Sequence, residues 1–238
     1  MTTLSLLVPF RDDGTRGRVA DWLLHRWAQR LPEAQVIVAE DDGRDPFCKA
    51  MAVNRAAAQA AGDVLGILDA DCWIRATHTR KAVNLIVSGK APWVIPANRC
   101  YRLTREFTER LLAMDPGENI PPVFRDGRER EGTVVAGLVL FPRAAWDLVG
   151  GMDERFRGWG SEDVSWLAIL DTLWGRHVQL THPLLHLWHP RARSDDRLPI
   201  WVGQTKRNSD LSRTYRRARG NPRAMAALCE EARQARHG

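Results

Sequence analysis

The chain has 238 residues, a length that fits one large domain or one domain with a small extension. Its 44% apolar and 27% charged residues are typical of an ordinary globular protein. No apolar run approaches the ~20 residues of a membrane-spanning helix, and the start lacks the basic segment of a signal peptide. The four scattered cysteines have no metal-type spacing, so we expect reduced thiols and a cytoplasmic location.

The net charge of +6 belongs to the C-terminal part of the chain. From residue 203 onward there are nine Lys or Arg and three Asp or Glu, so the rest of the sequence is balanced. We expect a main domain over residues 1–202 and a basic extension over 203–238, with a helix from Pro222 to about Ala235. The simpler interpretation of the extension is a solvated face packed on the domain. Attraction to an anionic partner such as nucleic acid is the alternative, although no nucleic-acid-binding motif supports it.

Strands and helices alternate in the N-terminal part of the sequence. Apolar patterns predict strands at 3–8, 35–39, 63–68 and 93–96, and helices at 16–30, 49–61 and 77–88. This order predicts a parallel sheet with helices on its faces. Further helices are expected at 104–114, 143–149 and 162–173, with an apolar strand at 133–141. The segment 115–132 is rich in Pro, Gly and charge, and predicts a long loop.

Polar clusters follow three successive predicted strands, at Pro9–Arg11, Glu40–Asp42 and Asp69–Asp71. Ligands bind beyond the carboxyl ends of parallel strands, so these clusters are expected to line one site. On an extended backbone Asp69 and Asp71 would point to the same side and offer hard oxygen ligands to a divalent cation. Capping of the next helix is the alternative explanation. The sequence has neither a Gly-x-Gly-x-x-Gly fingerprint nor a Gly-Lys-Ser/Thr loop, which argues against a dinucleotide dehydrogenase and a P-loop enzyme.

Two later segments also carry candidate residues. In Gly151–Asp163, glycines flank a tryptophan, and Ser161 precedes two acids in the first turn of a predicted helix, where capping and catalysis are both possible roles. Four of the seven histidines fall between His177 and His189. A neutral imidazole from this segment could complete a metal site begun by the two aspartates.

Taken together, these segments resemble glycosyltransferases of the GT-A fold, of the β-1,4-galactosyltransferase-like and related bacterial family 2 type. The resemblance covers about residues 3–190. It is carried by Pro-Phe-Arg, Glu-Asp-Asp-Gly, Asn-Arg-Ala at 54–56, Asp-Ala-Asp, Gly-Gly-Met-Asp-Glu-x-Phe-x-Gly-Trp-Gly-x-Glu-Asp and His-x-x-His-Pro. The chain departs from the family at Ser161, where a glycine is frequent. The resemblance implies an α/β, Rossmann-like GT-A fold with a mostly parallel sheet, and transfer of a sugar from a nucleotide-sugar donor, expected to be UDP-linked, to a hydroxyl acceptor.

The resemblance also implies roles for individual residues. Donor contacts are expected from Pro9, Phe10, Arg11, Glu40, Asp41, Asp42, Asn54, Arg55, Asp69 and Ala70. Mn²⁺ or Mg²⁺ would be held by Asp69, Asp71 and His189, with His186 as the alternative imidazole. Acceptor contacts are expected from Trp159, Gly160 and Glu162. Asp163 matches the catalytic base of the inverting enzymes, with Glu162 beside it.

Other hypotheses stay open. The chain could be a non-catalytic nucleotide- or sugar-binding module on the same scaffold, or a glycosyltransferase that acts on modified nucleic acid. A nucleotidyltransferase would also use paired carboxylates and a metal, but the loop after the first strand is only weakly suited to it. If the chain is a transferase, we expect the segment 115–132 to close over the donor, because water must be kept from a hydrolysable bond.

Overall fold

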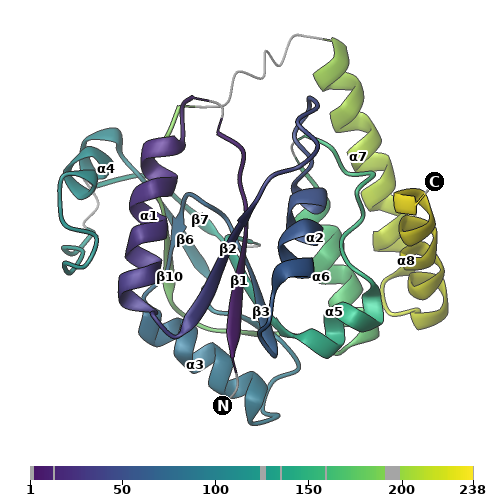
Figure 1. The fold of residues 1–238 in the computed structure, drawn as a ribbon. Helices are drawn as coiled ribbons and strands as arrows, with labels where there is room; N and C mark the ends of the chain where they lie inside the picture. The colour runs from purple at the N-terminus through teal and green to yellow at the C-terminus, as the bar shows by residue number, and fades with distance from the viewer. Residues whose placement is uncertain are drawn as a thin grey trace.

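A largely parallel sheet forms the centre of the molecule (Figure 1). The structure is a computed structural model and describes residues 3–12, 14–123, 127–134, 136–158, 160–190 and 199–237. The six strands of this sheet lie in the order β2-β1-β3-β8-β5-β9. They are β1 (Leu4–Pro9), β2 (Ala34–Ala39), β3 (Val64–Leu68), β5 (Val94–Ile95), β8 (Leu138–Pro142) and β9 (Val178–Gln179).

The predicted parallel arrangement is confirmed for most of this sheet. β1 pairs in parallel with β2 and β3, and β5 pairs in parallel with β9. β8 runs antiparallel to both of its neighbours, β3 and β5. Every residue of β1 and β3 is buried, as expected for central strands with helices covering both faces.

A smaller sheet lies beside the first and has the order β4-β10-β6-β7. Its strands are β4 (Cys72–Trp73), β10 (Pro183–His186), β6 (Arg99–Leu103) and β7 (Arg128–Thr133). β10 pairs antiparallel with β4 and parallel with β6. Because β4 directly follows the end of β3, this pairing brings a late segment of the chain to the carboxyl edge of the main sheet.

Helices cover the sheet. They are α1 (Gly17–Arg30), α2 (Lys49–Gln59), α3 (Ala76–Val87), α4 (Arg105–Leu112), α5 (Arg143–Val149), α6 (Glu162–Leu173), α7 (Pro199–Ala218) and α8 (Pro222–His237). α1 buries Val19, Leu23 and Trp27 at helical spacing, which explains its attachment to the core. α6 is buried on all sides from Ser165 to Leu170, so it is a core helix. None of the helices in the described ranges has the length and apolar character needed to cross a bilayer.

Two sequence predictions are wrong around residues 115–141. The expected strand at 133–141 is the end of β7 and the whole of β8, which belong to different sheets. The chain changes direction between them, and Gly137 has a φ of 99°, which a residue with a side chain would adopt only with strain. The expected long loop is also shorter, because β7 begins at Arg128. Its first residues are held by α1, where Arg26 donates to the carbonyls of Pro116 and Glu118. Closure over a donor stays a prediction.

The C-terminal extension packs on the domain through α7 and α8, which lie beside α6 (Figure 1). The helix predicted at Pro222 is confirmed, whereas α7 was not predicted, and the proposed boundary at residue 202 falls inside it. Tyr215 of α7 is fully buried, and its hydroxyl donates to Oδ2 of Asp153 over 2.9 Å. Arg233 and Arg236 of α8 donate to the carbonyls of Val149 and Met152. Part of the basic charge therefore serves packing.

We expect Tyr215→Phe to lower the free energy of unfolding by about 2 kcal/mol, because the buried carboxylate of Asp153 would lose the hydrogen bond that the Tyr215 hydroxyl donates to it. Urea titration measures the change. Tyr101→Phe is the control, since the Tyr101 hydroxyl has no hydrogen-bond partner among the described residues; its effect should stay within about 0.5 kcal/mol. Equal effects of the two substitutions would show that α7 is not held to the domain through this contact.

Candidate active site

The site begins where β3 ends, at a tight turn that carries both aspartates of the Asp-Ala-Asp motif. The amide of Cys72 donates to the carbonyl of Asp69 over 3.1 Å, so the backbone turns here instead of running on extended. The prediction that Asp69 and Asp71 share an extended backbone is therefore wrong. Their carboxylates nevertheless stay close, since ligand atoms of Asp69, Asp71 and Cys72 all lie within 4.8 Å of one another.

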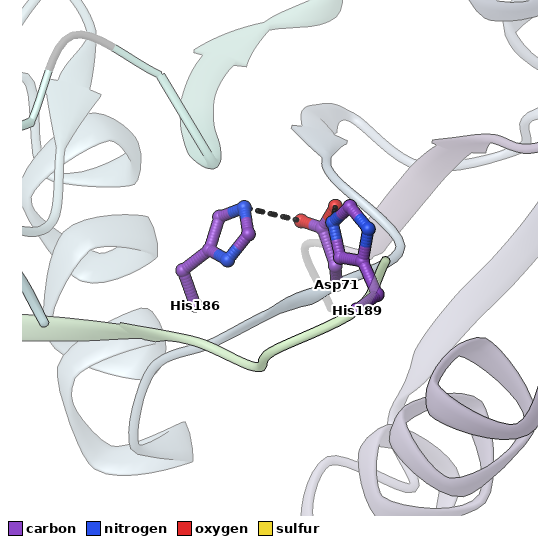
Figure 2. A group of neighbouring side chains, drawn as sticks. All are labelled: Asp71, His186 and His189. Carbon is purple, nitrogen blue, oxygen red and sulfur yellow. Dashed lines mark ion pairs between the residues drawn. The ribbon is translucent and has the colours of Figure 1, made fainter. Parts of the chain in front are cut away.

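Two histidines point toward the carboxylate of Asp71 (Figure 2). Nε2 of His186 lies 3.8 Å from Oδ1 of Asp71, and Nε2 of His189 lies 3.1 Å from Oδ2. Backbone pairing places them: His186 ends β10 opposite Cys72, and the amide of Leu187 donates to the carbonyl of Asp71 over 2.9 Å. The structure thus brings together both histidines that the resemblance singled out, along with the second aspartate of the motif.

His189 is oriented as a metal ligand would be. Its Nδ1 lies 2.8 Å from the carbonyl of Pro190, which accepts a hydrogen bond from an N–H on that nitrogen. The other nitrogen, Nε2, is enclosed by protein and, despite its closeness to Asp71, has no hydrogen-bond partner within the described residues. In a metal-bound histidine, one ring nitrogen usually donates to a carbonyl or a carboxylate, so that the other nitrogen faces the ion. A carboxylate with two imidazoles suits Mn²⁺ better than Mg²⁺, which prefers oxygen ligands.

The charges of this cluster are strongly coupled. Burial alone would raise the pKa of Asp71, but His186 and then His189 outweigh it, so that the pKa lies well below its usual range. Burial alone would lower the pKa of His189, but Asp71 outweighs it and the net shift is upward. Asp71 and His189 therefore each favour the charged form of the other. A bound cation would replace the positive charge that now stabilises the carboxylate of Asp71.

Lys49 joins the first aspartate of the motif to the candidate base, and sequence reasoning did not identify it. Its ammonium Nζ lies 2.7 Å from Oδ1 of Asp69 and 2.8 Å from Oδ1 of Asp163. Burial favours the neutral amine, but the carboxylates of Asp163 and Asp69 raise the pKa of Lys49 well above its ordinary value. Burial likewise raises the pKa of Asp69, with Lys49 acting against it.

Glu162 and Asp163 begin α6 but do not act as simple helix caps. Ser161 before them has a φ of 78°, and its side chain makes no capping hydrogen bond, so the predicted cap is wrong. Asp163 is ion-paired with Lys49, whereas Oε2 of Glu162 is enclosed and has no hydrogen-bond partner in the described part of the chain. Burial, followed by the charge of Asp163, raises the pKa of Glu162 to about 7.

The predicted donor segments after β1 and β2 are joined by ion pairs. Arg11 donates to Oδ1 of Asp41 over 3.2 Å and also pairs with Asp45. Asp41 is buried and accepts a hydrogen bond from the amide of Cys48, just before α2. Arg157 binds Asp42 over 2.7 Å and is the main cause that lowers the pKa of that carboxyl to about 2. The Pro9–Arg11 and Glu40–Asp42 segments therefore form one connected rim, as the strand-end rule predicted.

Asn54 and Arg55 bind backbone groups of neighbouring segments. The side chain of Asn54 binds both the amide and the carbonyl of Met152 and donates to Glu154 over 2.7 Å. Arg55 donates to the carbonyls of Glu40 and Asp41. These two residues thus hold the neighbouring segments in place, and direct donor contacts stay a prediction.

The acceptor residues are described only in part. Trp159 lies outside the described residues. Gly160 has a φ of 104°, and among the described residues other than its chain neighbours no atom lies within 4 Å of the place where a Cβ would sit. The backbone before α6 has a positive φ at Gly158, Gly160 and Ser161, directly before the carboxylate of Asp163 that meets Lys49.

Comparison with known proteins supports the fold. A family model described as the N-terminal domain of galactosyltransferase matches residues 126–170, a segment that includes β8, α5 and the start of α6. None of the curated proteins matches the sequence.

Three solved structures illustrate the similarity. GalNAc-T7 with UDP, GalNAc and Mn²⁺ aligns with a TM-score of 0.54 at 13% identity, over 98% of this chain and 55% of that chain. The catalytic domain of Drosophila β1,4-galactosyltransferase 7 with xylobiose aligns with a TM-score of 0.38 at 17% identity, over 70% and 59%. A mutant of that enzyme with manganese, UDP-Gal and xylobiose gives a TM-score of 0.38 at 16% identity, over the same shares.

The chain therefore spans little more than half the length of these solved structures. The alignment with GalNAc-T7 extends over almost the whole chain described above. The protein therefore has the GT-A fold that the resemblance implied, with a mostly parallel sheet between helices.

We expect Glu162→Gln to stabilise the protein increasingly as the pH rises. The folded pKa of about 7 exceeds the ordinary value of 4.5, so the contribution of Glu162 to stability is fully present below about 4.5 and is lost as the pH rises through 7. Urea unfolding at pH 5 and 8 should show the difference between variant and wild type growing by at most about 3 kcal/mol. Glu106→Gln, an exposed glutamate in the first turn of α4, should give a constant difference. A constant difference for Glu162→Gln as well would contradict the raised pKa.

Proposed function

We propose that this protein is a metal-dependent glycosyltransferase that moves a sugar from a UDP-sugar to a hydroxyl acceptor. The observation that carries the proposal is the cluster of Asp71, His186 and His189 at the carboxyl edge of the sheet, where the Nε2 atoms of both imidazoles face one carboxylate. The shared fold with GalNAc-T7, which was solved with UDP, GalNAc and Mn²⁺, supports a nucleotide-sugar donor and manganese.

Asp71, His189 and His186 would hold the metal ion, with Asp69 beside them. The ion would stabilise the negative charge that develops on the leaving diphosphate. The connected rim of Pro9–Arg11 and Glu40–Asp42 is the proposed nucleotide site, since it lies at the ends of the two strands next to β3. Glu162, with its raised pKa, and the turn around Gly160 would contact the acceptor.

Asp163 is the proposed base of an inverting reaction. Its carboxylate would accept the proton of the acceptor hydroxyl while that oxygen bonds to the anomeric carbon. The bond from the anomeric carbon to the diphosphate breaks in the same step, and UDP leaves with the electron pair. The contact of Asp163 with Lys49 fixes the carboxylate at the edge of the metal cluster, near the position where a donor phosphate would lie.

The experiments below also test two alternative functions. A non-catalytic module would bind UDP with Mn²⁺ but release no sugar. A transferase for modified nucleic acid would bind duplex DNA at physiological salt through the exposed basic residues of α7 and α8.

We expect UDP to bind the wild-type protein far more tightly with Mn²⁺ than without it, and Asp71→Ala to remove this metal dependence. The aspartate is the carboxylate that both imidazoles face, so its loss leaves the ion without its charged ligand. Calorimetric titration with UDP measures the effect. Asp147→Ala, an exposed aspartate of α5, should bind as the wild type does. Equal binding with and without Mn²⁺ in the wild type would contradict the metal site.

We expect Asp163→Asn to lower sugar transfer or donor hydrolysis by about a hundredfold or more, because the amide cannot accept the proton. Release of UDP from a panel of UDP-sugars, with UDP binding measured in parallel, provides the test. Asp147→Asn, at an exposed position of α5, should keep turnover within about twofold. If Asp163→Asn keeps wild-type turnover, the base lies elsewhere, and Glu162 becomes the next candidate. If no UDP-sugar is turned over by the wild type, the module hypothesis is favoured.

A further inference from the structure

Lys49 occupies a position that helix energetics disfavour. It is the first residue of α2, where the positive end of the helix dipole repels a cation, and α2 has no acid in its first turn. The side chain is only 14% exposed, so most of its hydration is lost. Such a placement is stable because the carboxylates of Asp69 and Asp163 both contact the ammonium group.

Cys48, the residue before Lys49, is fixed to two parts of the site. The amide of the preceding Cys48 donates to the buried Asp41 of the donor rim over 2.8 Å. Sγ of Cys48 contacts the carbonyls of Glu154 and Phe156, in the segment that leads to α6. Lys49 therefore projects from a fixed point between the donor rim, the end of β3 and the start of α6.

The two aspartates of the motif face different partners. Asp71 faces His186 and His189, whereas Asp69 faces Lys49. If both aspartates bound the metal ion, Lys49 would lose one of its two carboxylate partners and lie close to a divalent cation in a half-buried position. Coulomb repulsion between an ammonium group and a divalent ion at such short range is large, so Lys49 disfavours binding of the ion by Asp69.

We propose that Lys49 is a positioning residue that keeps Asp69 out of the metal's coordination shell and holds Asp163 at the reaction centre. This inference rests on the proposed function, because it assigns a role in the same site. It predicts that Asp71, His186 and His189 suffice for the metal, and that the first aspartate of the motif serves the lysine instead.

The test measures Mn²⁺ affinity of the protein without nucleotide, by electron paramagnetic resonance of free Mn²⁺, together with circular dichroism to confirm folding. Lys49→Met removes the ammonium group and releases Asp69, so Mn²⁺ should bind on the order of tenfold more tightly than in the wild type. Lys49→Arg keeps the charge and should bind Mn²⁺ as the wild type does. A lysine that only fills space or supports the fold would give unchanged or weaker binding in Lys49→Met.

Lys90→Met is the control for the loss of one positive charge. Lys90 is exposed and precedes β5, which runs in the same direction as β3 because both are antiparallel to β8. It therefore lies at the opposite edge of the sheet from Asp69, and its removal should leave Mn²⁺ affinity within about twofold.

Asp69→Asn keeps the test decisive if Lys49→Met does not fold. Its Mn²⁺ affinity should stay within about threefold of the wild type, because Asp69 is engaged by Lys49; a tenfold or greater loss would make Asp69 a metal ligand and overturn the proposal. If Lys49→Met binds Mn²⁺ and the wild type does not, the result supports the role of Lys49 but contradicts the proposed dependence of the wild-type protein on a metal. Absence of binding in both proteins would overturn both inferences.

Discussion

The antiparallel pairing of β10 with β4 is the constraint on which the candidate site depends. It sets His186 opposite Cys72 and ties the amide of Leu187 to the carbonyl of Asp71. Without this short ladder, residues more than a hundred positions apart in the chain would not share one cluster. The ladder is short, but β10 also pairs with β6 along its whole length, so that the smaller sheet holds the histidine segment in register.

Much of the fold could be predicted from local patterns. Apolar runs and helical spacing predict the β1-α1-β2-α2-β3 order. Because ligands bind beyond the carboxyl ends of parallel strands, the acids that follow β2 and β3 are then expected at one edge of the sheet. The pattern failed at 133–141, because a continuous apolar run does not reveal that its two halves pair with different sheets. It also failed for α7, whose buried face consists of Asn208, Ser212, Tyr215 and Ala218. Their spacing is helical, but polar side chains conceal it from an analysis based on hydrophobicity.

The site was predictable where its residues are recognisable metal ligands, and unpredictable where a role depends on tertiary contacts. Asp71 and His189 are residue types that bind cations, so their pattern was informative. Lys49 looked like an ordinary surface residue of an alanine-rich helix; only the fold shows its ammonium group between Asp69 and Asp163. Likewise, the sequence did not reveal that the amide of Asn54 binds the Met152 backbone and Glu154.

The start of α6 shows how the backbone serves this electrostatic arrangement. Ser161 holds a left-handed conformation that costs a residue with a side chain roughly 1–2 kcal/mol. In return, the chain enters α6 without a side-chain cap, and Asp163 turns toward Lys49 instead of toward the free amides of its own helix. Strain kept at such a position is common where a site must orient a reactive group. The helix tolerates this strain because its buried residues from Ser165 to Leu170 anchor it in the core, while its first turn lies at the candidate site.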